Sequence, residues 1–508
     1  MLRDPSPQQL EIEMVTLESL VPQDHLLRKI DQFISFDFIR DKVRDLYCPD
    51  NGRPAVDPVM LFKMLFIGYL FGIPSERRLV QEIQVNVAYR WFLRLRLTDK
   101  VIDASTFSQT RRRRFAESTI YQDIFDDIVR QAVSYRMVGG RVLYTDSTHL
   151  KASANKKKWR EAQVTASARA YMDELEQAVE QDRLRHNKKP LPEKTRRPDD
   201  EDNDSGTPEQ EAATRTIKQS TTDPDSGYMV REGKPEGFFY LDHRTVDAKY
   251  AIITDSHVTP GNVNDSTPYL ARLDRQVETF GFEVEAVGLD AGYNNAPLCH
   301  GLVKRGLVDS VLGYCRPPRH AGYLPKRAYV YDEELDVYRC PQGEVLSYQT
   351  TNREGYRIYV SNPTVCAGCE RRMECTRSRN KQKQVTRHVW QDDRERLDRN
   401  RLSEVGRRLY KGRQETVERS FADAKQHHGH RYARYRGLSK VQMQSLLAAA
   451  CQNMKKIALV QSRKRGKDGD PAPDGLFNAV RRYVSRLWRD YLPNGTVRAE
   501  MISVAVWY

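Results

Sequence analysis

The sequence contains no long hydrophobic run. Its most apolar stretch, PVMLFKMLFIGYLFGI at residues 58–73, is too short to span a bilayer and contains Lys63. We therefore expect a buried helix here, with Asp57 as its N-cap and Pro58 at its first position. The start of the sequence, MLRDPSPQQLEIEM, lacks the apolar region of a signal peptide. These absences predict a protein that is neither embedded in a membrane nor exported.

Cysteine is also sparse, with 8 residues in a chain of 508. So few cannot form a disulfide scaffold, and a reducing, cytoplasmic compartment fits better. Half of them fall within residues 340–375, a stretch with little apparent core of its own, where CPQG and CAGC resemble tight turns. A structural zinc ion would order this stretch, with Cys340, Cys366, Cys369 and Cys375 as its ligands. Buried free thiols are the alternative, because only one Cys-x2-Cys pair is present.

Positive charge is in excess. Lys and Arg number 83 against 69 Asp and Glu, a formal net charge of +14, so a polyanionic partner is plausible. Residues 401–456 carry much of the excess, with 13 Lys and Arg against 4 Asp and Glu. The length allows two to four domains, each with its own core.

Residues 20–135 are predicted to be all-helical. SERRLVQEIQ (75–84) begins with a good cap, and DASTFSQTRRRRF (103–115) begins a helix at Ser105. That second helix ends in four consecutive arginines: Arg111, Arg112, Arg113 and Arg114. Two interpretations remain open, a helix-turn-helix-like reader of DNA and a helical bundle with a solvated basic face.

Strands dominate the pattern from residue 140. We predict strands at 141–150, 237–248 and 250–261, a helix at 266–281, a strand within 283–295, a helix at 296–306, a short strand at 309–314 and a long helix at 409–429. This order is that of the RNase H-like fold, a mixed α/β sheet. Two segments interrupt it. Residues 159–226 read as a charged helix followed by a disordered linker, RRPDDEDNDSGTPEQEAATR, and residues 315–400 hold the clustered cysteines.

Carboxylates follow two of these strands. Asp146 ends the first and Asp290 ends the fourth, and the two strands are adjacent in an RNase H-like sheet. The late helix offers Glu415 and Glu418, and Lys425 lies two turns beyond Glu418 on the same face. Three converging carboxylates can hold two divalent cations about 4 Å apart for attack on a phosphodiester, and Mg²⁺ suits such oxygen ligands. Taken singly, each acid could instead be a cap or a surface ion-pair partner.

Basic residues lie close to these acids. Lys156, Lys157 and Lys158 follow the first strand and would face phosphates. The segment HHGHRYARYRGL, after the late helix, interleaves aromatic and basic side chains suited to stacking on bases and to binding phosphates. A metal site in its histidines is the alternative. The residues concerned are His427, His428, His430, Arg431, Tyr432, Arg434, Tyr435 and Arg436.

Several blocks of sequence, in order, resemble those of the DDE transposases of bacterial insertion sequences: TDSTHLKASANK, TVDAKYAIITDSHVTPGNVND, GLDAGYNN and ETVERSFADAKQHHGHRYARYRGLSKV. The helical segment 20–115 is similar to the N-terminal domain of the same group, so the resemblance covers about residues 15–460. It implies an acidic triad of Asp146, Asp290 and Glu418.

The group's Tyr-x2-Arg-x3-Glu-x6-Lys signature is matched with one departure. Tyr410 and Arg413 have the expected spacing, and so do Glu418 and Lys425, but four residues separate Arg413 from Glu418 instead of three. The roles of Tyr410 and Arg413 therefore stay open. Glu415 is the competing third acid, and the spacing to Lys425 favours Glu418.

The resemblance implies an enzyme that binds double-stranded DNA at terminal inverted repeats, cleaves it and joins it to target DNA. It implies two Mg²⁺ ions per active site, with Mn²⁺ possible, and at least a dimer in the complex that pairs two ends. The alternatives are a DNA-binding regulator on a catalytically dead relic of the fold and a plain nuclease. The predicted parts are a helical DNA-binding domain (1–135), the first part of the core (140–158), an insertion (159–236), the second part of the core (237–314), a Cys-rich insert (315–400), the catalytic helix with the basic end of the core (401–460), and a linker with an accessory helix (466–508).

Overall fold

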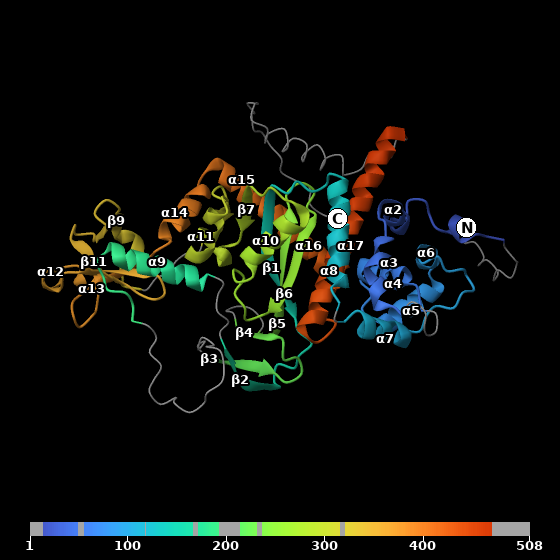
Figure 1. Ribbon diagram of the computed structural model, residues 1–508, viewed down its shortest axis with the longest axis horizontal. Coiled ribbons are helices and arrows are strands. Elements are labelled where there is room, and N and C mark those ends of the chain that lie inside the picture. The colour runs from blue at the N-terminus through green and yellow to red at the C-terminus, as the bar shows by residue number, and fades with distance from the viewer. Residues whose placement is uncertain are drawn as a thin grey trace, which may run out of the picture.

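The computed structural model describes residues 14–48, 55–116, 118–165, 171–192, 214–230, 236–314 and 321–469. A helical region lies at one end, a mixed sheet lies in the middle, and a second, smaller sheet lies at the other end (Figure 1). The predicted fold class, an RNase H-like core with insertions that follows an all-helical N-terminal region, is confirmed. No helix in the described ranges is both long and apolar enough to cross a membrane.

The N-terminal helices pack around the stretch that is most apolar in sequence. This stretch forms α4 (Pro58–Leu70), in which Asp57 caps the N–H of Val59 and every residue from Leu61 to Leu70 is buried. It shares one hydrophobic core with the long helix α17 (Leu438–Gly469), which also lies against the sheet. The other helices are α1 (Leu17–Leu20), α2 (Leu26–Phe33), α3 (Phe38–Val43), α5 (Glu76–Val85), α6 (Val87–Phe92), α7 (Ala104–Arg114) and α8 (Ile120–Ser134).

The central sheet has the strand order expected of an RNase H-like core. Its core strands are β1 (Val142–Lys151), β5 (Gly237–Asp247), β6 (Ile253–Pro260), β7 (Ala286–Leu289) and β8 (Val311–Leu312). They are arranged β6-β5-β1-β7-β8, with β6, β5 and β1 antiparallel and β1, β7 and β8 parallel. Thr145 is the register partner of Leu289, so Asp146 and Asp290 follow at the same level of neighbouring strands.

The predicted end of strand β1 was wrong. Asp146 lies in the middle of β1 and does not end it, because the 11-residue strand β5 keeps pairing with β1 as far as Lys151. Only the pairing with β7 stops at Thr145. The carboxylate therefore emerges where one neighbour strand ends while the other continues.

Helices cover both faces of this sheet. On one face lie α10 (Tyr269–Phe280), α11 (Ala296–Lys304) and α14 (Gln391–Asn400), which bury Leu143. On the other face lie α15 (Glu404–Arg413), α16 (Arg419–His427) and α17, which bury Tyr144. Because side chains alternate along a strand, Asp146 shares the face of Tyr144 and looks toward α15 and α16.

The insertion after β1 differs from its prediction. Residues expected to begin a charged helix at 159 form strand β2 (Trp159–Thr165), and the helix α9 covers only Met172–Arg185. Strands β3 (Thr214–Ser220) and β4 (Gly227–Met229) continue the sheet in the order β2-β3-β4-β5. Most of the predicted linker lies at 193–213, outside the described residues.

The Cys-rich insert has a core of its own, contrary to expectation. A five-stranded antiparallel sheet, β13-β12-β11-β10-β9, buries Tyr338, Leu346 and Tyr359. Its elements are β9 (Val330–Asp332), β10 (Val337–Arg339), β11 (Val345–Thr351), β12 (Tyr356–Ser361), α12 (Pro363–Ala367), α13 (Arg372–Cys375) and β13 (Gln384–His388). At the C-terminal end, α17 runs past the expected linker start at 466, and the accessory helix predicted around residues 477–488 lies outside the described residues.

Candidate active site

Three carboxylates meet around one arginine. Nη1 of Arg413 donates to Oδ2 of Asp146 at 2.7 Å, and Nη2 donates to Oε1 of Glu418 at 3.0 Å. Nη2 also lies 3.6 Å from Oδ1 of Asp290. Arg413 is only 4% exposed. The three acids named from the sequence, far apart in the chain, are thus brought together at one end of the sheet.

The helix that carries Arg413 and Glu418 is interrupted between them. A five-residue π-helix, Gln414–Glu418, links α15 to α16. A π-turn accommodates one extra residue in an α-helix and keeps the flanking faces aligned. Arg413 and Glu418 therefore lie on the same face with four residues between them, as they would in an α-helix with three. The departure from the signature spacing has a structural explanation.

The competing acid stands elsewhere. Oε1 of Glu415 lies 3.9 Å from Nζ of Lys411. None of the contacts described for Arg413 involves it. The geometry favours Glu418 as the third acid of the cluster, as the spacing to Lys425 does.

Burial shapes the electrostatics of the cluster. It raises the pKa of Asp146 to about 6, and the nearby charge of Asp290 adds to the rise. Arg413 and the N–H of Ser147 oppose this by stabilising the carboxylate. For Arg413, burial lowers the pKa, but attraction to the surrounding carboxylates outweighs it, and the net pKa is raised. The cluster therefore favours additional positive charge beside Asp146.

Carboxylate oxygens are the ligands that a cation such as Mg²⁺ prefers, and three carboxylates lie around one buried positive charge here. As they lie, the carboxylates surround a guanidinium. In the described ranges, no group of three or more His, Cys, Asp or Glu side chains is close enough to hold an ion. Lys425, the basic residue of the signature, lies on the same side of the sheet, with Nζ 2.6 Å from Oγ1 of Thr148.

A fourth carboxylate borders the cluster and was not singled out from the sequence. Oγ of Ser147 donates to Oδ1 of Asp265 at 2.8 Å. The hydroxyl of Tyr293 is buried and has no hydrogen-bond partner among the described residues. Burial raises its pKa, and the charges of Asp265, Asp146 and Asp290 add to that. The sequence did contain a signal for this residue: Asp265 ends the PGNVND segment, just after a strand.

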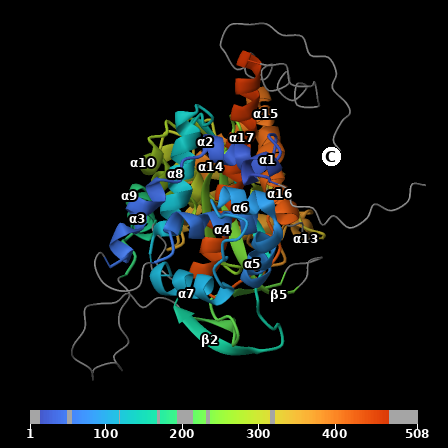
Figure 2. The same ribbon diagram turned by 90° about the vertical axis from the view of Figure 1, so that its right-hand side faces the viewer.

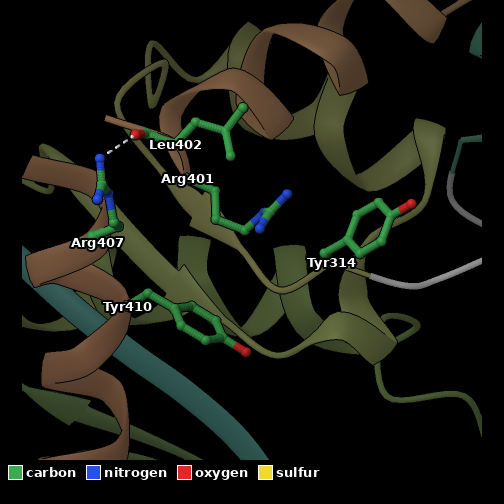
Figure 3. Close-up of a pocket in the computed structure, with 5 residues that line it drawn as sticks. All are labelled: Tyr314, Arg401, Leu402, Arg407 and Tyr410. Carbon is green, nitrogen blue, oxygen red and sulfur yellow. Dashed lines mark hydrogen bonds between the residues drawn. The ribbon is translucent and has the colours of Figure 1, made fainter. Parts of the chain in front are cut away.

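A cavity of about 510 Å³ lies beside the cluster, lined by Tyr314, Arg401, Leu402, Arg407 and Tyr410 (Figure 3). The guanidinium of Arg401 lies 5.0 Å from the ring of Tyr314, and the ring of Tyr410 lies 5.3 Å from the guanidinium of Arg413. A Cβ on Gly313 would stand 2.8 Å from the Tyr410 hydroxyl and 2.5 Å from the backbone N of Ala291. Tyr410 therefore packs against the backbone that follows Asp290, and the cavity adjoins the carboxylates.

The four arginines of α7 are not equivalent. Arg112 and Arg113 are exposed, and Arg114 lies over the ring of Tyr47 at 4.1 Å. Arg111 is 7% exposed, forms a 2.8 Å ion pair with Glu76, and stacks on the ring of Tyr435. This side chain joins the helical region to the segment after the late helix. It was assigned to DNA contact from the sequence, but its contacts lie inside the protein.

The basic segment after α16 is partly interior as well. His428 and His430 are buried: Nδ1 of His428 lies 2.9 Å from the carbonyl of Tyr69, and Nε2 of His430 lies 2.8 Å from Oδ2 of Asp242. Both side chains pack between the late helix and its neighbours, so these two residues are not exposed to solvent.

The arginines of this segment differ in exposure. Arg431 and Arg436 are exposed, whereas Arg434 is half-buried over the ring of Tyr69. Lys156, Lys157 and Lys158 are all exposed. These lysines, together with Arg431 and Arg436, have side chains that solvent or a nucleic acid can reach.

The four clustered cysteines line one small cavity. Cys340, Cys366, Cys369 and Cys375 surround about 40 Å³ at the edge of the second sheet, and each is a free thiol. The hydroxyl of Tyr329 lies 2.9 Å from Sγ of Cys375. The four share the lining of this cavity with eight other residues, and among the described residues they do not form a group that could hold an ion; the zinc ion stays a prediction.

Comparison with known proteins gives two family matches. Residues 15–113 match a family described as a transposase domain (DUF772), and residues 339–458 match one described as a transposase DDE domain. The second match includes Glu418 and Lys425. No curated protein matches the sequence. A solved structure described as the cryo-EM structure of piggyBac transposase synaptic complex with hairpin DNA aligns over 94% of this chain and 87% of its own, at 10% identity and a TM-score of 0.32, too low to support a structural argument.

Proposed function

We propose that this chain, in which residues 15–113 match a transposase domain and residues 339–458 match a transposase DDE domain, is a DDE-type transposase that binds the terminal inverted repeats of an insertion sequence and catalyses Mg²⁺-dependent cleavage and strand transfer. One observation carries the proposal. Asp146, Asp290 and Glu418 converge around Arg413 in a sheet with RNase H-like strand order.

Asp146, Asp290 and Glu418 are the residues that would hold the divalent cations. Bound there, these ions would supply positive charge to the phosphate in the transition state and lower the pKa of the attacking water or 3′-hydroxyl. Lys425, which reaches β1 at Thr148, would contact the phosphate from the same face. Arg413 keeps the carboxylates oriented and partly neutralised, so the cluster tolerates burial before DNA arrives.

The cavity beside the cluster fits the DNA strand at the scissile bond. Arg401 and Arg407 offer positive charge for phosphates, and Tyr314 and Tyr410 offer rings for stacking. Further contacts would come from Arg112, Arg113 and Arg114 on α7, from Lys156, Lys157 and Lys158 after β1, and from Arg431, Arg434 and Arg436 after α16. The α7 residues would anchor the protein to the element's end.

Two finer parts of the proposal concern assembly. A zinc ion held by Cys340, Cys366, Cys369 and Cys375 would brace the insert next to the core. Pairing of two DNA ends requires two active sites, so the working form would be at least a dimer. The free thiols fit a cytoplasmic enzyme. The proposal keeps the division of the chain into a helical DNA-binding domain, a core in several parts, a Cys-rich insert and a C-terminal accessory helix.

The test is incubation of the purified chain with Mg²⁺ and a duplex that carries the element's ends, followed by mapping of nicks and joined products. Transposition predicts a 3′-hydroxyl at the element's end and covalent joining of that end to a second duplex. Cleavage without joining would make the protein a nuclease. Binding without cleavage would make it a regulator on an inactive relic.

A further inference from the structure

Strands β2 and β3 form a two-stranded arm that extends the central sheet beyond its core. They pair with each other from Trp159–Ser220 to Thr165–Thr214, whereas β3 joins the rest of the sheet only at Gln219–Gly227. In both views the arm lies at the lower edge, away from the helices that cover the sheet (Figures 1 and 2). Such a ribbon has little hydrophobic support of its own.

The arm and the turn that leads into it present mostly positive charge. The basic side chains whose exposure the structure describes here are exposed: Lys156, Lys157, Lys158, Arg160 and Lys218. Of the nearby acids, Asp223 and Asp225 accept hydrogen bonds from the N–H groups of Gly437 and Leu438 at the start of α17. Glu161 lies opposite Lys218 on the described part of the ribbon, and Glu236 accepts a hydrogen bond from the hydroxyl of Tyr228 beside it.

An aromatic and cationic row crosses the sheet at this point. Nζ of Lys218 lies 4.7 Å from the ring of Trp159 and 4.7 Å from the ring of Tyr228. Trp159 is 39% exposed, although the other described tryptophans, Trp91 and Trp390, are 9% and 7% exposed. A large indole left open on a basic ribbon suits a partner that is both anionic and able to cover a flat ring.

Double-stranded DNA has this chemistry, and a two-stranded β-ribbon fits the width of its major groove. We propose that the arm lies in a groove of the DNA that flanks the cleavage site, with Trp159 and Lys218, which share one face of the ribbon, as its contacts. This rests on the proposed function, because the DNA must already be held at the carboxylates. From Asp146 to the end of β1 at Lys151 the strand covers about 17 Å, so the arm would meet DNA outside the site at the carboxylates.

The experiment measures affinity for a 30-base-pair duplex of mixed sequence across a salt series. We expect Lys218→Ala to flatten the slope of log affinity against log salt by roughly one, because each phosphate contact contributes about 0.9. Lys188→Ala is the matched control, since Lys188 is also exposed and lies near a tyrosine ring, that of Tyr348. The control should keep the wild-type slope.

A second measurement uses Trp159→Phe, which keeps an aromatic ring and so guards against misfolding. The wild-type protein should lose tryptophan fluorescence when the duplex is added, and Trp159→Phe should lose much less. Unchanged salt slopes in the arm variant together with unchanged quenching in Trp159→Phe would overturn the inference and leave the proposed function standing. A wild-type protein that binds no duplex at any salt concentration would overturn both.

Discussion

Arg413 donates a hydrogen bond to Glu418 at 3.0 Å across a π-helical turn. In an unbroken α-helix, a separation of five residues would rotate the two side chains apart. The π-turn restores their alignment. It directly follows Arg413, the residue that contacts both Asp146 and Asp290. The irregularity is therefore part of how the cluster is built, as π-turns at functional sites commonly are.

Deletion of Gln414 tests this explanation. Removing one residue from the π-turn should convert it to α-helix and leave both flanking faces in place. We expect the free energy of unfolding to change by less than about 1 kcal/mol. Deletion of Gln81, an exposed residue in α5, a helix without a π-turn, is the matched control. It should rotate Leu79 away from the core relative to Ile83 and cost several times more, as measured by denaturant unfolding. Equal losses in the two deletions would contradict the role given to the π-turn.

Stability should depend on pH through Asp146. Its pKa in the folded protein is raised to about 6 by burial, above its value of about 4 in an unfolded chain. The folded state therefore keeps a proton that the unfolded chain releases, and this contribution to stability is lost as pH rises from about 4 to about 6. The loss should reach up to about 3 kcal/mol for the wild type relative to Asp146→Asn.

The measurement is denaturant unfolding of both proteins in a chelating buffer at several pH values. Taking the difference between the two proteins removes the contributions of other groups, such as His243 and His257, whose pKa values burial lowers to about 4. A difference that stays flat between pH 4 and pH 6 would show that Asp146 is not held in a buried site.

Arg111 should matter for stability more than for DNA. Replacement by alanine removes the partner of Glu76 from a largely buried ion pair and uncovers the ring of Tyr435. We expect a loss of about 3 kcal/mol in the free energy of unfolding. Arg113→Ala, on the exposed side of the same helix, should change it by no more than about 0.5 kcal/mol. Similar stabilities for the two variants would contradict the structural role of Arg111 and make it again a candidate for contact with DNA.

The sequence predicted the parts of the core that depend on local pattern. Apolar strands followed by carboxylates located Asp146 and Asp290, and the spacing to Lys425 selected Glu418. What failed depended on tertiary contacts. Four identical arginines cannot show which one faces inward, and only the packing of α7 on Tyr435 separates Arg111 from Arg112.

Strand β2 shows the same limit in secondary structure. Its sequence, WREAQVT, resembles the start of a charged helix, but pairing with β3, which is distant in the chain, overrides that propensity. The burial of His428 and His430 after α16 could not be predicted from the sequence for a similar reason. Nothing in the local sequence indicates that Asp242 and the carbonyl of Tyr69 lie within reach of them.

The cysteine cavity gives a prediction about metal content. The purified protein should carry close to one zinc ion per chain, and Cys366→Ser or Cys369→Ser should lose it and lower the thermal midpoint, because a tetrahedral site needs all four ligands. Cys299→Ser, at a buried thiol outside the cluster, is the control and should keep its zinc. Metal analysis that finds no zinc in freshly purified wild-type protein would leave the four thiols as ordinary packing residues.

The central claim is that Asp146, Asp290 and Glu418 act together on DNA. The most direct measurement compares cleavage of a duplex that carries the element's end by wild type, Glu418→Gln and Glu415→Gln in Mg²⁺, with binding to the same duplex measured in parallel. The account predicts that Glu418→Gln cleaves orders of magnitude more slowly and still binds, whereas Glu415→Gln stays close to wild type. An active Glu418→Gln beside an inactive Glu415→Gln would contradict it.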